Sequence, residues 1–437
     1  MMVVDRSGTS ADSASSLEVA SYRVADVRQA TQMRLLKGRL EVNLEEVREL
    51  ALSEPAVTEV QVSLVRPGES VRLANVLDAI EPCIKADSPE TTFAGILGQL
   101  EPLGLGLTNR LADVAVVPLC DFRSTHDVDR EMEAPIRWHS IIDMDGPGRP
   151  YTHWGSTTNV VLQFTCKSDD PLAECDRAIR RATAGVARLL ASATIGAPAD
   201  RTETFCWDAE AADLPGIAAI IQVGADEPLL DTYFYGSSLR DTVPFLIDPR
   251  EVLDGALTAG AYEYSGVRNP TQFYQRNKLV LSLLRLHGSR IRFVGVIPTL
   301  AYVQSNFEKS RHAMIAARLA KSLGATGAIV ASYGTGNAQT GTMLTCRACE
   351  AMGVKTTVIV SETNGGLIDH VPEADAVISV GNHEELVREW EPEATLGGRY
   401  YDVESNSPIE SPGPLSLMGY FGSSSQMGDT CLRTVAV

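Results

Sequence analysis

Between residues 291 and 380, short apolar runs alternate with longer segments whose apolar residues recur with helical spacing. Such runs predict buried strands, and such segments predict amphipathic helices. The predicted strands are residues 291–297, 328–331, 356–360 and 376–380, and the predicted helices are residues 305–323 and 340–352. Strands that alternate with helices across short Gly-containing loops form a parallel sheet with right-handed crossovers. We therefore expect a Rossmann- or flavodoxin-like α/β domain at residues 289–390.

The pattern before residue 248 is less regular and richer in strands. Predicted strands cover residues 19–24, 40–42, 57–65, 112–120, 159–164 and 217–223, and predicted helices cover residues 44–52 and 171–191. The Gly/Leu-rich residues 95–107 are expected to begin with a helix. We assign a disordered tail to residues 1–16, a β-rich α+β domain to 17–247 and an irregular tail to 391–437, in which 422–428 is a candidate to return to a site. The predicted fold class is α/β, with an irregular, β-rich mixed half preceding the parallel sheet.

Residues 248–288 join the two patterns. Their centre, residues 254–264, has the sequence Asp-Gly-Ala-Leu-Thr-Ala-Gly-Ala-Tyr-Glu-Tyr, and a short helix is predicted at residues 277–286. Small residues accompanied by Asp, Tyr, Asn and Gln at a domain junction predict the wall of a cleft, because ligand sites favour such interfaces.

The amino-acid composition argues against some classes of binding partner and of cellular location. The apolar fraction of 44% and the charged fraction of 22% are typical of a soluble globular protein. A net charge of -18 argues against a nucleic-acid partner, because phosphates are bound by clustered Lys and Arg. No apolar run approaches the ~20 residues of a membrane-spanning helix. The eight cysteines are scattered, as expected of reduced thiols in the cytoplasm, and Cys346 and Cys349 are expected on one helix near the core.

Two groups of residues are candidates for chemistry. Asp143 and Asp145 precede a Gly-Pro-Gly turn, and with His139 and His153 they form a candidate metal or acid–base set. Their spacing fits no specific metal signature, and capping of turns is the commoner use of such side chains, so we predict no metal site.

The second group follows the predicted parallel strands. Ligands bind at the carboxyl ends of strands in open parallel sheets. The residues expected there are Gly334, Gly336, Asn337 and Glu362. A glycine-rich turn at a helix start can bind an anion, although a simple tight turn explains it equally well, and no complete nucleotide fingerprint is present.

Six runs carry a family resemblance. They are Arg-Pro-Gly-Glu-Ser-Val-Arg at 66–72, Ile-Glu-Pro at 80–82, Ile-Ile-Asp-Met-Asp-Gly-Pro-Gly at 141–148, Asp-Thr-Tyr-Phe-Tyr-Gly at 231–236, Asp-Gly-Ala at 254–256, and the loop and helix at 334–353. The first is also predicted to be a surface turn with a local ion pair. Together, and in this order, they resemble the substrate-specific component B proprotein of the glycine, sarcosine and betaine reductases; the D-proline reductase proprotein is a more distant relative.

The resemblance implies a definite chemistry. Proproteins of that family cleave themselves before a cysteine that follows Asp-Gly-Ala, and the new N-terminal cysteine becomes a pyruvoyl group. Its carbonyl can form a Schiff base with an amino substrate, which withdraws electrons from the bond to be broken. A second subunit, with selenocysteine or cysteine, takes part in reductive cleavage of the C–N bond.

This sequence departs from the family at the cleavage position. The Asn-Cys junction of the family falls at Ala261-Tyr262, and the nearest hydroxyl residues of other types are Thr258 and Ser265. A Tyr hydroxyl cannot attack the preceding carbonyl, because it lies far along the ring from its own amide. We therefore predict an uncleaved chain without a pyruvoyl cofactor.

We expect an oligomeric enzyme subunit that acts on a small nitrogen-containing metabolite. Its partner would be a second reductase-type subunit, similar to selenoprotein B in a cysteine form. The residues expected to be catalytic are Tyr262, Asp254 and Glu362, and those expected to bind substrate are Tyr235, Asn269, Gly334, Gly336, Asn337, Asp143 and His153. Two alternatives are a non-catalytic scaffold subunit and a metal-dependent lyase or hydrolase.

Overall fold

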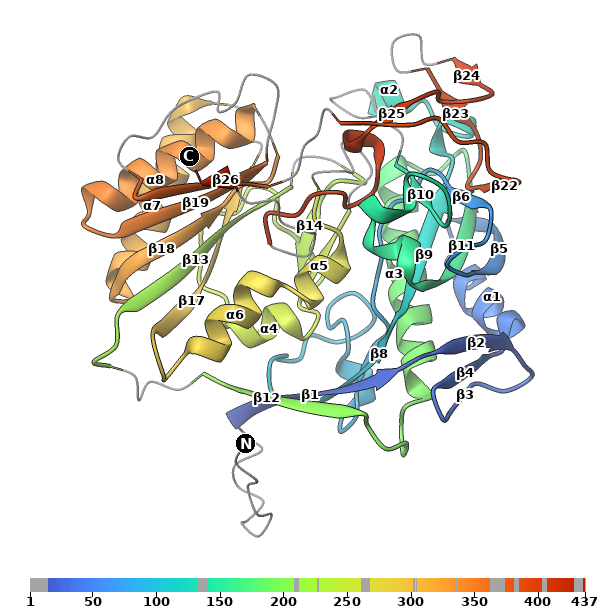
Figure 1. Cartoon of the computed structure of the whole chain (residues 1–437), viewed down its shortest axis with the longest axis horizontal. Helices are drawn as coiled ribbons and strands as arrows, with labels where there is room; N and C mark the ends of the chain where they lie inside the picture. Colours follow the sequence, from blue (N-terminus) through green and yellow to red (C-terminus); the bar gives the residue numbers. More distant parts are fainter. Residues whose placement is uncertain are drawn as a thin grey trace.

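The largest sheet lies in the C-terminal part of the chain (Figure 1). The computed structural model describes residues 15–131, 140–207, 212–225, 228–260, 268–301, 303, 305–334, 336–361, 374–380, 385–402, 407–427 and 435–436. The sheet has the order β17-β13-β18-β19-β20-β26. Its strands are β13 (Gly216–Val223), β17 (Arg292–Leu300), β18 (Ala325–Ala331), β19 (Lys355–Ser361), β20 (Ala376–Val380) and β26 (Val435–Ala436). The first five are parallel to their neighbours, and β26 is antiparallel to β20.

Two helices connect these strands and cover one face of the sheet. They are α7 (Asn306–Ser322) and α8 (Asn337–Ala351), which pack against each other and against β18. The N-cap of α7 is Ser305, whose side chain accepts from the Glu308 amide, as expected at a helix start. The α/β class and the parallel sheet predicted from the alternating pattern are confirmed.

One strand of this sheet comes from before residue 248. β13 lies between β17 and β18, and its central residues Ala218, Ala219 and Ile220 are fully buried. Continuous burial on both faces is typical of a central parallel strand. The C-terminal sheet therefore includes a strand from the part of the chain before residue 248, where the hydrophobic pattern changes.

Two sheets form most of the N-terminal part. One has the order β12-β1-β8-β7 and the other the order β5-β11-β9. Their strands are β1 (Ser16–Arg23), β5 (Val57–Val65), β7 (Cys83–Lys85), β8 (Gly106–Ala112), β9 (Val114–Cys120), β11 (Thr158–Cys166) and β12 (Arg201–Cys206). The helices α1 (Leu44–Leu52) and α3 (Leu172–Ser192) pack together over β5, and their apolar faces form the largest core cluster with these strands.

Smaller elements complete the fold. The short strands are β2 (Asp26–Gln29), β3 (Arg34–Leu36), β4 (Arg39–Val42), β6 (Val71–Leu73), β10 (Ile142–Asp143), β14 (Thr232–Phe234), β15 (Ser237–Ser238), β16 (Leu257–Ala259), β21 (Leu386–Val387), β22 (Ala394–Leu396), β23 (Tyr400–Tyr401), β24 (Pro408–Ile409) and β25 (Leu415–Ser416). The short helices are α2 (Val128–Glu131), α4 (Pro249–Leu253), α5 (Thr271–Gln275) and α6 (Lys278–Leu286). The junction segment thus contributes α4, β16, α5 and α6, and its three helices lie between the two large parts in Figure 1.

One predicted element is wrong. Residues 95–107 contain turns and bends instead of a helical start, and their end begins β8. The polar residues Asn109 and Arg110 interrupt the apolar pattern by which a strand is predicted, yet both are buried. Their partners come from distant segments, because Asn109 donates to Thr194 Oγ1 at 3.0 Å and Arg110 donates to the Gln275 carbonyl at 2.8 Å.

The C-terminal tail is tied to both parts of the molecule. β22 pairs in parallel with β6 in the N-terminal part, and the Leu279 amide of α6 donates to the Met427 carbonyl at 3.1 Å. No described helix is long and apolar enough to cross a membrane. Cys346 and Cys349 are both buried on α8, as expected.

Candidate functional site

A short strand leads the chain into the centre of the junction segment. β16 pairs with β14 in antiparallel register, with Ala259 opposite Thr232. The Gly260 amide then donates to the Asp231 carbonyl at 3.2 Å. A Cβ atom at Gly260 would lie 1.9 Å from the Leu229 carbonyl oxygen and 2.5 Å from Arg180 Nη2. The position therefore has no room for a side chain.

Arg180 brings a buried guanidinium to Gly260. It lies on α3, where Asp176 accepts from its Nε at 3.0 Å, and its Cζ is 4.8 Å from the centre of the Tyr233 ring. Its Nη1 and Nη2 atoms are buried and make no hydrogen bond within the described part of the chain. A guanidinium with open donors is suited to bind a carboxylate or another anionic group.

Asp78 places a titratable carboxyl in the same site. Its Oδ1 accepts from the Thr271 amide at 2.8 Å, and its Oδ2 accepts from Thr271 Oγ1 at 2.6 Å. The same hydroxyl accepts from the Ala259 amide at 2.9 Å, which ties Asp78 to the end of β16. Burial raises the pKa of Asp78 to about 7, although the hydrogen bonds from Thr271 and the charge of Arg180 oppose the rise. Asp78 can therefore gain or lose a proton near neutral pH.

A small cavity connects these charged groups. It measures about 10 Å³ and is lined by Asp78, Asp176 and Arg180 among others. This is about the space that one water-sized probe occupies. The acid and the guanidinium therefore line one small cavity.

The described residues that follow the centre of the junction segment meet the parallel sheet. The Cζ of Arg268 lies 4.9 Å from the centre of the Tyr333 ring, and both residues are buried. Tyr333 follows β18, and its amide donates at 3.0 Å to Gln222 Oε1 on β13. The site therefore lies at the carboxyl ends of two adjacent parallel strands, where such sheets bind ligands.

The glycine turn predicted at this edge follows directly. Gly334 is buried beside Tyr333, and its carbonyl accepts from Ser332 Oγ at 3.2 Å. Gly336 has a φ of 62° and precedes α8, a conformation that favours glycine. Asn337 begins the helix and is exposed. The structure thus brings Gly334 to the site and leaves the Asn337 side chain at the surface.

Asn269 brings an amide to the site from the other side of Arg268. It is fully buried, and its Oδ1 accepts from Ser425 Oγ at 3.5 Å. Its Nδ2 has no hydrogen-bond partner among the described residues. Ser424 and Gln426 are also buried, so the C-terminal stretch that we expected to return to a site does reach the junction segment.

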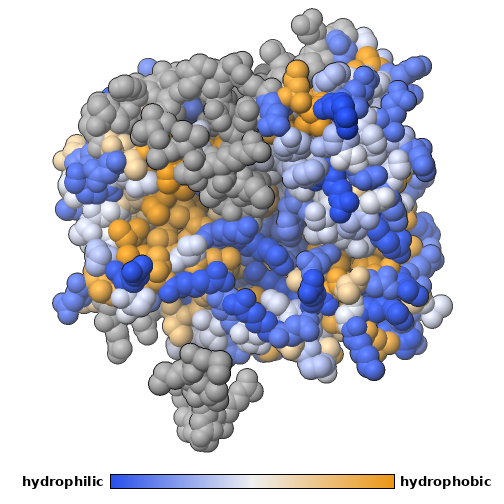
Figure 2. Space-filling model, in the orientation of Figure 1, coloured by the Kyte–Doolittle hydropathy of each residue, from blue (hydrophilic) through white to orange (hydrophobic). Residues whose placement is uncertain are grey.

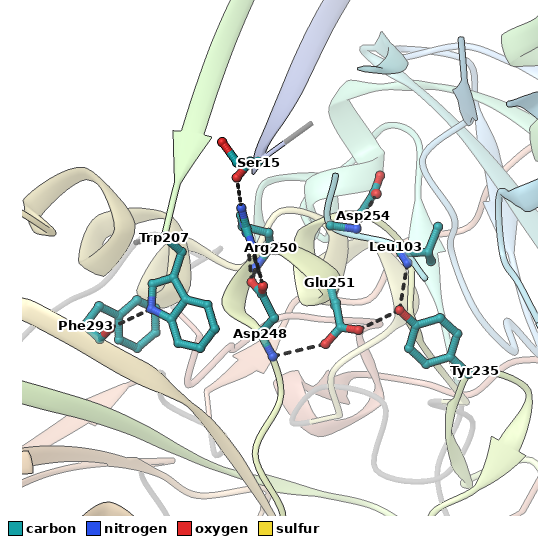
Figure 3. A network of polar contacts seen from close by, with 10 residues as sticks. Ser15, Leu103, Trp207, Tyr235, Asp248, Arg250, Glu251, Asp254 and Phe293 are labelled. Atoms are coloured by element: carbon teal, nitrogen blue, oxygen red, sulfur yellow. Dashed lines mark hydrogen bonds and ion pairs between the residues drawn. The ribbon is translucent and has the colours of Figure 1, made fainter. Parts of the chain in front are cut away.

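Asp254 and Tyr235 lie together at the opposite end of the β14–β16 pair (Figure 3). Asp254 Oδ2 accepts from Lys85 Nζ at 2.8 Å and from the Gly104 amide at 2.7 Å, and its Oδ1 accepts from Thr108 Oγ1. The Tyr235 hydroxyl donates to Glu251 at 2.7 Å, and burial raises the pKa of that hydroxyl. These contacts occupy both carboxylate oxygens of Asp254, and they tie α4 to the N-terminal sheet.

Asp143 and His153 occupy separate surroundings. Arg72 donates to both oxygens of Asp143, at 2.6 and 3.0 Å, and Tyr420 donates to Oδ2 at 3.0 Å. The pKa of His153 is lowered by burial and then by the positive charge of Arg276. Across the described ranges, no group of three or more His, Cys, Asp and Glu could hold a metal ion.

Three of the residues singled out from sequence lie outside the described residues: Tyr262, Glu362 and His139. Their roles stay predictions. Gly260 and Arg268 are the described residues on either side of residues 261–267.

Three described residues of the site carry no recognisable motif. Asp78 follows a run of mixed residues, Arg180 is one of several Arg residues on an amphipathic helix, and Arg268 lies beyond the Gly/Ala-rich centre. What they share is a buried charged group, which a single sequence does not display.

Comparison with known proteins agrees with this organisation. The family model for glycine/sarcosine/betaine reductase component B subunits matches residues 15–407. The glycine reductase complex component B subunits alpha and beta of Acetoanaerobium sticklandii are 32% identical over 380 residues, which cover 84% of this chain and 85% of the relative. No solved structure matches the chain.

Two relatives from Peptoclostridium acidaminophilum are similar over the same extent. The sarcosine reductase complex component B subunit alpha is 29% identical over 84% of this chain and 85% of its own length. The betaine reductase complex component B subunit alpha is 28% identical over 85% of each chain. The resemblance inferred from the six runs is confirmed, and the chain belongs to the family of glycine/sarcosine/betaine reductase component B subunits.

Proposed function

We propose that this chain acts uncleaved and without a pyruvoyl group, as the substrate-binding subunit of a reductase complex. Its substrate is a small nitrogen-containing metabolite, and a second reductase-type subunit supplies the electrons. The observation that carries the proposal is Tyr262, which stands where the family resemblance implies a cysteine.

The described surroundings of the junction support an unprocessed chain. A pyruvoyl group requires a Cys, Ser or Thr at the cleavage position, with its hydroxyl or thiol next to its own amide. The nearest described candidate is Thr258, which is buried in the middle of β16 and opposite Tyr233 in regular strand pairing. These residues do not fit the formation of a pyruvoyl group.

The site offers an alternative to electrophilic activation. Arg180 can bind an anionic group of the substrate, and Asn269 Nδ2 can donate a hydrogen bond. Asp78 can transfer a proton, because burial raises its pKa to about 7. In this proposal Tyr262 is a hydrogen-bond donor or acid and Glu362 a second acid–base group. Asp254, which was expected to be catalytic, is given a structural role instead, because its ion pair with Lys85 anchors the segment that leads into β16.

The proposed function is tested by an activity assay of the intact hetero-complex. The full-length chain is co-expressed with its reductase-type partner, and turnover of small amines and amino acids is measured with a thiol reductant. Tyr262→Phe is expected to lower kcat about 10²- to 10⁴-fold, the usual contribution of an acid–base group. Tyr22→Phe, which removes a hydroxyl from the N-terminal sheet, serves as the control.

A scaffold role is the second candidate. Asp143 and Asp254, two of the predicted site residues, are both held in buried ion pairs. This arrangement stabilises the fold without leaving either carboxylate open to a substrate. If Tyr262→Phe assembles with its partner and retains full turnover, the chemistry belongs to the partner and the scaffold role is correct.

A further inference from the structure

A groove between β12 and α6 is lined by cationic side chains. It has a volume of about 350 Å³, which is within the range of small-molecule sites. The cationic residues that line it are Arg110, Arg201, Arg276, Lys278 and Arg285. The only carboxylate among its described lining residues is Glu203. The chain as a whole has a net charge of -18, so the positive charge of the groove is opposite in sign to that of the protein.

Regular secondary structure places these residues. Arg201, Glu203 and Phe205 alternate along β12 and so share one face of the N-terminal sheet. Ser21 of β1 lies opposite both Arg201 and Arg110 in the strand register. The sheet therefore presents cations from strands on both sides of β1.

The other wall of the groove is one face of α6. Its lining residues are Lys278, Leu281, Ser282 and Arg285. Their spacing of three and four positions puts them side by side on the helix. Arg285 donates to Glu203 at 2.7 and 2.9 Å, and this ion pair joins the helix to β12. Figure 2 shows hydrophilic residues as a band across this part of the molecule.

Arg110 lies at the inner end of the groove. Its side chain is 8% exposed and its Nη1 donates to the Gln275 carbonyl at 2.8 Å. Its Nε and Nη2 are buried and form no hydrogen bond with any described residue. The nearest carboxylate, Glu81, is 3.9 Å from Nη1 and also pairs with Arg276. Leaving buried donors of a guanidinium unpaired is costly, so a ligand that accepts from them would bind favourably.

The rest of the lining is apolar. Val19, Phe205, Leu253 and Leu281 contribute side chains between the charged residues. Positive charge remains in excess even when both Glu203 and Glu81 are counted. A ligand with an apolar body and more than one negative charge matches both features. The geometry points to a binding site for a small organic dianion, with a phosphate-type head and a short apolar body.

This site is separate from the one proposed for catalysis. The groove opens between β12 and α6, whereas Arg180 and Asp78 lie around Gly260. One connection between the two is α5, whose Gln275 carbonyl accepts a hydrogen bond from Arg110. Binding at the groove can therefore be measured without any assay of turnover.

The test uses phenyl phosphate as the probe and isothermal titration calorimetry of the full-length chain. A matched pair of variants isolates charge, because Ser282→Glu and Ser282→Gln add side chains of the same length to the mouth of the groove. Ser282→Glu is expected to raise Kd at least about tenfold through repulsion, and Ser282→Gln to change it less than about twofold. Lys278→Gln is expected to raise Kd about tenfold, while Lys321→Gln, on α7, leaves it unchanged.

Each outcome decides the proposal. Saturable binding of one phenyl phosphate per chain, with the expected order of the Ser282 variants, supports the site. Absence of saturation at about 1 mM probe, or equal Kd values for Ser282→Glu and Ser282→Gln, overturns it. Benzoate, which has a similar apolar body but a single charge, is expected to bind several-fold more weakly than phenyl phosphate.

Discussion

Asp78, Asp143 and Asp254 are all buried carboxylates, but their neighbours differ. Arg72 neutralises Asp143 and Lys85 neutralises Asp254, each through direct contact. Asp78 instead accepts hydrogen bonds from Thr271 and Ala79, with Arg180 acting only at longer range. At the scale of single residues, this difference separates ion pairs that hold the fold from a carboxyl that can take part in proton transfer.

The raised pKa of Asp78 predicts a loss of stability towards neutral pH. The folded state holds the proton up to a pKa of about 7, whereas the unfolded state loses it near 3.8. The stabilisation is therefore complete below the unfolded value and is lost as pH rises through the folded value. Asp78→Asn is expected to flatten the dependence of the free energy of unfolding between these two values, measured by urea denaturation. Asp113→Asn, at the surface, should retain the dependence of the unaltered chain.

Lys85 provides a test of the buried ion pairs. Lys85→Met leaves Asp254 charged, buried and without its cation, so we expect a loss of about 3 to 5 kcal/mol in the free energy of unfolding. Lys355→Met removes a cation from the exposed pair with Asp375 and is expected to have no measurable effect. Equal effects of the two substitutions in urea denaturation would contradict the structural role given to Asp254.

The sequence alone located the junction but not the residues that surround it. The six runs that resemble the family include residues 254–256, and they occur in this chain in the same order as in the family. Asp78 and Arg180 were not recognised, because each reaches Gly260 only through tertiary packing of segments far away in the sequence. A single sequence contains no record of such contacts.

The same limit applies at the scale of elements. α1 and β5 were predicted at their observed bounds, residues 44–52 and 57–65. The helix buries Val47 and Ala51 one turn apart, and the strand alternates apolar and polar residues from 60 to 64. β8 was missed, because its buried Asn109 and Arg110 interrupt any apolar pattern. Hydrophobic periodicity therefore does not identify strands with buried polar residues, such as β8, whose Arg110 lines the groove beside α6.

Gly260 tests how tightly β16 is packed at the site. Gly260→Ala would place a Cβ 1.9 Å from the Leu229 carbonyl oxygen, and this backbone atom cannot rotate away. We expect a loss of about 1 to 3 kcal/mol by overpacking, together with weaker substrate binding. Gly98→Ala, where the nearest atom would be 3.8 Å away, is the control for thermal unfolding. A neutral effect at Gly260 would show that the backbone around β16 can shift.

At the scale of the whole molecule, the C-terminal tail connects the parts. Met427 is buried in the core cluster beside α6, and its carbonyl accepts from the Leu279 amide. Met427→Ala is expected to destabilise the chain by about 2 to 5 kcal/mol, measured by chemical denaturation. Met314→Ala, at a position that is 38% exposed on α7, is expected to change stability far less. If both variants unfold alike, the tail does not contribute to the core.

The central claim concerns the covalent state of the chain. The junction segment lies between the two large parts of the molecule, and self-cleavage there would divide the protein into two polypeptides. Tyr262 at the family's cleavage position predicts that this does not happen. The claim therefore depends on one bond, between Ala261 and Tyr262.

The most direct test is the intact mass of the purified, denatured full-length protein. We predict a single species of 47.0 kDa that does not react with hydroxylamine. Two polypeptides that meet between Ala261 and Tyr262, or one fragment with a blocked, hydroxylamine-reactive N-terminus, would contradict the account.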